Sequence, residues 1–164
     1  THTKAIDWEL QLQKSDHWWR ELDMLQMSCY QKGADKAGAT VEEMVANLKP
    51  QLERFRQYAA AYGKPISFGE CGCTSSTGAA MTPSGWTPDG KFDEDEQANY
   101  LEAVLQTFWE EPWWYGLYWW KWDEQNDRPH FRTDPAGDKG FTVSGKRAQA
   151  VMREWFARSD KQRG

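Results

Sequence analysis

Three stretches of the chain, at 22–30, 64–72 and 113–122, have the length and composition of β-strands. The first alternates along its length. One of its faces is apolar, and the other becomes polar toward the end, where Ser28 and Tyr30 lie. This pattern predicts a strand that buries one face under helices and presents a polar carboxyl end on the other.

The stretch at 64–72 is bounded by glycines and is rich in strand-forming residues. Strict alternation puts Ile66, Phe68 and Glu70 on one face. The other face carries the small residues Ser67, Gly69 and Cys71. A carboxylate at the carboxyl end of a buried parallel strand is where an α/β barrel keeps its chemistry. A solvated glutamate at a strand end is the alternative, and the spacing alone leaves both open.

Helical periodicity fills the intervals between the strands. Thr40 and Glu43 form a capping box at the start of the first long helix, and Gly63 is expected to end it. Pro50 lies inside this pattern and predicts a kink or a break. A second helix is expected to open at Asp93 with acidic residues in its first turn, and Ser144 is expected to cap the last helix.

The order strand–helix, repeated three times, predicts an α/β fold with parallel strands joined by right-handed crossovers. With 164 residues, the chain has the size of a single domain, 1–164. No apolar run reaches the ~20 residues of a membrane span, so no membrane partner is expected. The net charge of −5 argues against nucleic acid as a partner.

Chemistry based on metals or cofactors is not indicated by the sequence. The three cysteines do not form a zinc or redox motif, and the three histidines are scattered. We therefore expect no metal and no cofactor. The cellular compartment stays open. The unusual feature is the 11 tryptophans, several of them clustered near the end of the third strand, at Trp119 and Trp120.

Taken together, the strands resemble the C-terminal part of retaining glycoside hydrolases with a (β/α)₈ barrel, and most closely glycoside hydrolase family 113, the β-mannanase-like group. The likeness runs from about Trp18 to Phe156. It is carried by five motifs in order, at 22–30, 63–72, 97–100, 116–122 and 139–146. The sequence departs from the family at Ser28, where an Asn is frequent, and at Gly69, where a Thr is common.

The resemblance implies that the chain holds about strands six to eight of a TIM barrel, the C-terminal portion of the catalytic domain. Glu70 would then be the catalytic nucleophile of a retaining mechanism, and Tyr30 and Ser28 would lie in the site. The second carboxylate, the acid/base, would lie at the end of the fourth strand, outside this chain. We therefore expect the missing N-terminal half, or a second copy, to complete the barrel.

A carbohydrate substrate, a mannan-like β-linked polysaccharide or oligosaccharide, is the partner that the resemblance implies. Trp120 is the expected stacking platform for a sugar ring, because indole packs well on the apolar face of a pyranose. Trp119 takes that role if the opposite face of the strand points inward. Two alternatives stay open: a barrel relative that binds carbohydrate without catalysis, and a structural protein that uses tryptophan as core filler.

Overall fold

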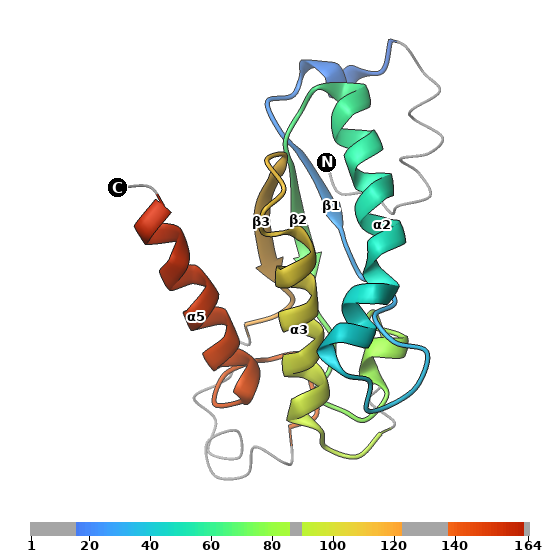
Figure 1. Cartoon of the computed structure of the whole chain (residues 1–164), viewed down its shortest axis with the longest axis vertical. Helices are drawn as coiled ribbons and strands as arrows, with labels where there is room; N and C mark the ends of the chain where they lie inside the picture. The colour runs from blue at the N-terminus through green and yellow to red at the C-terminus, as the bar shows by residue number, and fades with distance from the viewer. Residues whose placement is uncertain (1–15, 86–89, 123–137, 163–164) are drawn as a thin grey trace.

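The computed structural model describes residues 16–85, 90–122 and 138–162, which form one parallel sheet with helices against it. The strands are β1 (Leu25–Ser28), β2 (Ile66–Cys71) and β3 (Trp114–Trp119). They pair side by side in the order β1-β2-β3, and both pairings are parallel (Figure 1). The predicted α/β class with parallel strands is confirmed.

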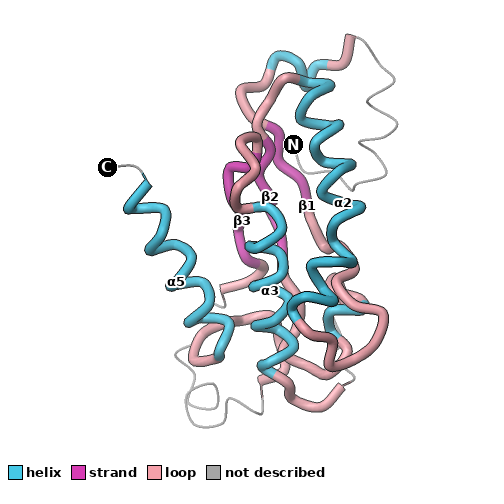
Figure 2. The backbone as a smooth tube through the Cα atoms, viewed as in Figure 1, coloured by secondary structure: helices cyan, strands magenta, loops and turns pink. Residues whose placement is uncertain are grey.

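Three long helices connect and follow the strands: α2 (Val41–Tyr62), α3 (Glu94–Phe108) and α5 (Arg147–Gln162). The short 3-10 helices η1 (Trp18–Glu21) and η2 (Ala79–Met81) lie before β1 and in the loop after β2. Along the chain, helix and strand alternate, with loops between them (Figure 2). None of the described helices is long and apolar enough to cross a membrane.

The ends of α2 form as the sequence predicts. Thr40 Oγ1 accepts a hydrogen bond from Glu43 N (3.3 Å), and Thr40 N donates to Glu43 Oε2 (2.8 Å), which is a complete capping box. Gly63 ends the helix in the left-handed region, with φ 62°. Pro50 is exposed and α2 continues through it, so the alternative of a break is wrong.

The last helix begins later than the sequence suggests. Ser144 was expected to cap it, but α5 starts at Arg147, and Gly145, with φ 73°, turns the chain in between. The carboxylate of Glu94, from the first turn of α3, accepts the hydrogen bond of Arg147 N instead (2.9 Å). A side chain distant in sequence has replaced the local cap, which no local pattern can show.

The core lies between the sheet and the helices, and Phe68 is at its centre. Its ring is 5.5 Å from Phe55 of α2 and 4.9 Å from Phe108 of α3. Trp114 of β3 packs against the same ring at 5.7 Å. Ile66 and Phe68 are fully buried.

The opposite face of the sheet is not covered by any described helix. Met24 is 39% exposed and Tyr118 is 65% exposed. Ile66 and Phe68, which strict alternation assigned to the face of Glu70, lie on the helix side. An irregularity in β2 after Phe68 separates them from Glu70.

Candidate active site

Glu70 is the penultimate residue of β2, at the carboxyl end of the sheet. The register along β1 advances one residue at a time until Met27 pairs with Phe68, and the next pair is Ser28 with Glu70. Gly69 is therefore an extra residue in β2, a β-bulge. A bulge re-aims the side chains that follow it, and here it turns Glu70 to the face opposite Phe68.

Contacts with Gln26 identify the face of the sheet to which Glu70 turns. A β-carbon built on Gly69 would lie 2.5 Å from Gln26 Cγ, and Gln26 Nε2 donates a hydrogen bond to Ser67 Oγ (3.4 Å). Ser67, Gly69 and Glu70 thus all face the uncovered side of the sheet. The prediction that Glu70 shares a face with Ile66 and Phe68 is wrong, because strict alternation fails at the bulge.

Two hydroxyl groups of the first strand and its continuation hold the carboxylate of Glu70. Ser28 Oγ donates a hydrogen bond to Glu70 Oε2 at 3.3 Å, and Tyr30 OH donates to the same oxygen at 3.2 Å. Burial raises the pKa of the Tyr30 phenol, and the charge of Glu70 raises it further. Tyr30 therefore stays protonated and remains a donor throughout the neutral range.

The two tryptophans at the end of β3 lie in different surroundings. Trp120 follows the strand, is half-buried, and its backbone N–H donates to the carbonyl of Cys71 (2.8 Å), which places it beside the end of β2. A β-carbon on Gly72 would overlap the Trp120 carbonyl oxygen, so glycine is required for this approach. Trp119 packs against the core, and its indole N–H donates to the carbonyl of Phe141 (2.8 Å).

The structure thus brings Ser28, Tyr30 and Glu70 into direct contact, with Trp120 at the adjoining strand end. Trp119 lies on the helix side. Alternation puts Tyr115 on the same face as Leu117 and Trp119, but Tyr115 is 68% exposed whereas Leu117 packs against the core. The register with β2 shifts between these two positions, next to Gly116 (φ 108°). A bulge has therefore changed the parity of β3 as well.

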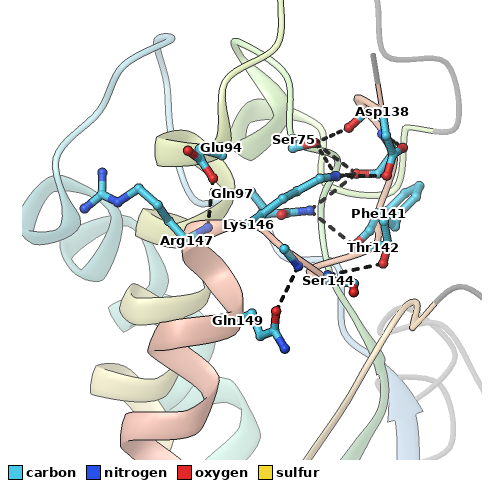
Figure 3. A network of polar contacts seen from close by, with 12 residues as sticks. Ser75, Glu94, Gln97, Asp138, Phe141, Thr142, Ser144, Lys146, Arg147 and Gln149 are labelled. Atoms are coloured by element: carbon cyan, nitrogen blue, oxygen red, sulfur yellow. Dashed lines mark hydrogen bonds and ion pairs between the residues drawn. The ribbon is translucent and has the colours of Figure 1, made fainter. Parts of the chain in front are cut away.

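Sequence reasoning missed a buried polar network behind the site (Figure 3). Lys146 is 4% exposed, and its Nζ contacts Ser75 Oγ (2.8 Å) and Asp138 Oδ2 (3.2 Å). Burial lowers the pKa of this lysine, while Asp138 raises it. Gln97 is also fully buried within the network. The only signal in the sequence was that both residues belong to motifs of the family resemblance.

The described residues contain no cluster of histidine, cysteine or carboxylate side chains able to hold a metal ion. The three cysteines are buried free thiols. Burial raises the pKa of Cys71 to about 12, and the Cys29 and Cys73 thiols are shifted in the same direction. Thiols of this kind are poor nucleophiles and poor ligands. The carboxylate–hydroxyl group at the sheet edge is therefore the better candidate for chemistry.

Comparison with solved structures finds a similar fold in glycosidases. The β-mannanase of Alicyclobacillus acidocaldarius, solved in complex with ManMIm, aligns with a TM-score of 0.70 and 25% identity, over 90% of this chain and 42% of that one. A β-1,4-mannanase complex aligns with a TM-score of 0.68 and 24% identity, over the same shares. A β-glucuronidase of Faecalibacterium prausnitzii aligns with a TM-score of 0.53 and 17% identity, over 95% and 24%.

The chain therefore spans less than half the length of the mannanases that it resembles. No curated protein matches it. The model of one family does match, that of Glycoside Hydrolase Family 113, and it covers residues 5–146. This match extends over most of the sequence and over all three strands. On this basis, the chain belongs to glycoside hydrolase family 113.

Proposed function

We propose that this chain is the C-terminal part of a retaining glycoside hydrolase that cleaves a mannan-like β-linked polysaccharide or oligosaccharide, with Glu70 as the nucleophile. The observation that carries the proposal is the pair of hydroxyl donors, Ser28 and Tyr30, on one oxygen of Glu70 at the carboxyl edge of the sheet. Family membership and the mannanase relatives support the reaction class and the substrate class.

In this mechanism, Glu70 attacks the anomeric carbon of the bound sugar, and the glycosidic oxygen leaves as a covalent glycosyl–enzyme forms. A second carboxylate, about 5–5.5 Å away, protonates the leaving oxygen and then activates the water that hydrolyses the intermediate. That residue belongs to a part of the enzyme outside this chain. Tyr30 and Ser28 fix the orientation of the Glu70 carboxylate, so that it needs little rearrangement on the way to the transition state.

Trp120 is the proposed sugar platform, because it is half-buried beside the end of β2 and offers an aromatic surface near Glu70. Trp119 was predicted to bind substrate as well. Its indole N–H is engaged with Phe141, so its proposed contribution is to support Trp120 from the helix side. Ser28 and Tyr30 complete the proposed substrate-binding residues.

We also propose that the three strands are about the sixth to eighth of a (β/α)₈ barrel. Three parallel strands whose described helices lie on one face, over 42% of the length of the related mannanases, support this placement. The uncovered face, with Glu70 on it, then points to the barrel axis. The N-terminal half of the protein, or a second copy, would supply the remaining strands and the acid/base carboxylate.

The proposal is tested in the full-length enzyme with Glu70→Gln. Turnover of β-1,4-linked manno-oligosaccharides should be lost, because the amide cannot attack, while the dissociation constant measured by calorimetry should change little. The matched control is Glu110→Gln, which neutralises an exposed glutamate at the far end of α3 and should leave turnover unchanged. Turnover of Glu70→Gln within about tenfold of the wild type would contradict the assignment. Binding without turnover by the wild type would favour the non-catalytic alternative.

A further inference from the structure

The amino-terminal turns of α3 contact the loops that follow all three strands. Glu96 is 2% exposed, and its carboxylate accepts the backbone N–H groups of Gly38 (3.0 Å) and Ala80 (3.2 Å). Tyr100 OH donates to the carbonyl of Gln31 (2.9 Å). These bonds reach the loops after β1 and β2. Gln97, which lies between Glu96 and Tyr100 in α3, contacts the loops after β2 and β3.

We propose that Gln97 is a positioning residue, which holds the backbone just after Glu70 at a fixed distance from the segment that anchors the tryptophans of β3. The inference rests on the proposed function of Glu70 and Trp120. It assigns a role to a residue that touches neither the substrate nor the reacting atoms.

The contacts of the Gln97 carboxamide span both loops at once (Figure 3). Its Nε2 donates to the carbonyl of Cys73 at 2.9 Å and to that of Phe141 at 3.2 Å, and it lies 3.4 Å from the carbonyl of Gly140. Cys73 is three residues after Glu70 in the chain. One amide group therefore ties the loop after β2 to the loop after β3.

The carbonyl of Phe141 connects this amide to the aromatic end of β3. It accepts the hydrogen bond of Gln97 Nε2 and also that of Trp119 Nε1, at 2.8 Å. Trp119 directly precedes Trp120. A displacement of the Phe141 carbonyl therefore acts on the strand end that carries the proposed platform, while a displacement of Cys73 acts on the strand end that carries Glu70.

The chemistry of the position explains why an amide is suited to it. Several carbonyl oxygens converge here, so the side chain must donate, and a neutral donor avoids the cost of burying another charge beside Lys146. Gln97 Oε1 is buried and finds no hydrogen-bond partner among the described residues. The fold thus tolerates an unsatisfied acceptor in order to keep the donors of Nε2.

Lys146 offers a second link between the same loops, through Ser75 Oγ and Asp138 Oδ2. Because this link remains when Gln97 is replaced, we expect the loops to shift rather than to unfold. That makes a variant at Gln97 informative. A misplacement on the order of 1 Å in an active site is enough to cost about 100-fold in rate.

The test is Gln97→Met in the full-length enzyme, which keeps the side-chain volume and removes the donors. We expect kcat to fall about 10- to 100-fold while KM changes less than about threefold, because the attack geometry is altered more than the stacking surface. Hydrogen–deuterium exchange of the peptides covering 72–77 and 139–145 should become faster. The control is Thr107→Val, which removes a buried hydroxyl bonded within α3 to Ala103 (2.6 Å), far from the loops.

Two results would overturn the proposal. One is a kcat for Gln97→Met within about twofold of that of Thr107→Val at a temperature where both are folded by circular dichroism. The other is unchanged exchange in both loop peptides. A wild-type enzyme without glycosidase activity would refute the proposed function instead. In that case, unchanged exchange would still refute the loop-linking role of Gln97, and faster exchange would support it.

Discussion

Gly69 lies so close to Gln26 that a β-carbon on the glycine would be 2.5 Å from Gln26 Cγ. This contact marks the point at which β2 gains its extra residue and Glu70 turns toward Ser28. The position of the proposed nucleophile thus depends on a backbone irregularity at a residue without a side chain. Because Gly69 has no side chain, the bulge leaves room for the side chain of Gln26.

We predict that Gly69→Ala destabilises the protein by about 1–2 kcal/mol, since the new methyl group must displace the Gln26 side chain and break its hydrogen bond to Ser67. Urea denaturation of the full-length protein measures this change. Gln26 is flexible, so the double variant Gly69→Ala with Gln26→Ala should recover part of the loss. Simple additivity of the two single variants would show that the clash with Gln26 is not the cause.

The bulge also explains which parts of the site the sequence could predict. The three strands, their parallel order and the capping box at Thr40 follow from local patterns, and they are confirmed. The face of Glu70 does not follow, because an alternating pattern cannot reveal one extra residue. The strand-end position of Glu70 was inferred correctly, but its neighbours Ile66 and Phe68 were assigned to the wrong face.

Contacts between distant segments set a second limit on prediction. The start of α5 is determined by Glu94, which is 53 residues away from Arg147 in the chain. The role of Gln97 likewise depends on carbonyl groups from two loops that come together only in the fold. Neither relationship leaves a local periodicity or a cap residue to recognise. For Gln97, the one sequence signal is its place in a motif of the family resemblance.

We predict that Tyr30→Phe lowers kcat/KM about 10- to 100-fold, because it removes one of the two hydroxyl donors from Glu70 Oε2. Ser28→Ala should also lower kcat/KM, since the Ser28 hydroxyl donates to the same oxygen. Steady-state kinetics on a manno-oligosaccharide measure both variants. Because the donors share one oxygen, the double variant should not show the product of the two single effects.

Tyr62→Phe is the matched control for Tyr30→Phe. The Tyr62 hydroxyl lies at the end of α2, is buried, and has no hydrogen-bond partner among the described residues. Its removal should leave kcat/KM unchanged and should not lower stability. Equal losses of activity in both tyrosine variants would indicate a general effect on folding, and would contradict a specific contact with Glu70.

Glu111 provides a prediction of pH dependence. Arg56 donates two hydrogen bonds to its carboxylate (2.6 and 3.0 Å) and Trp113 Nε1 a third (2.8 Å). The bonds from Arg56 lower the pKa of Glu111 below its ordinary value of 4.5. A lowered folded pKa stabilises the protein above pH 4.5, and this contribution is lost as the pH falls through the lowered value.

We therefore predict that Glu111→Gln lowers the melting temperature by a few degrees at pH 7 and that the difference from the wild type shrinks below about pH 4.5. Calorimetric melts across pH 3 to 7 measure the effect. Glu53→Gln is the control, because Glu53 contacts the same arginine but through one longer bond, at 3.3 Å. A difference that stays constant over this pH range would show that the ionised form of Glu111 is not what stabilises the fold.

The last prediction concerns the 164-residue chain produced by itself. In the described residues, β1 and β3 each pair with one strand only, so each leaves an edge of unpaired backbone N–H and C=O groups. The uncovered face also exposes Met24 and Tyr118, and removing this apolar surface from water would favour association. We expect the isolated chain to associate with itself, or with the rest of the enzyme when both are present.

Sedimentation velocity at several concentrations measures this association. A double variant, Met24→Lys with Tyr118→Lys, should weaken this association, since like charges would then face each other across the contact. Unchanged association of the double variant would indicate that the strand edges dominate. The isolated chain should hydrolyse no glycoside at a useful rate, because a retaining mechanism needs a second carboxylate near Glu70. A monomer with a cooperative melt at every concentration would show that three strands and one layer of helices are sufficient, and that the open edges need no partner.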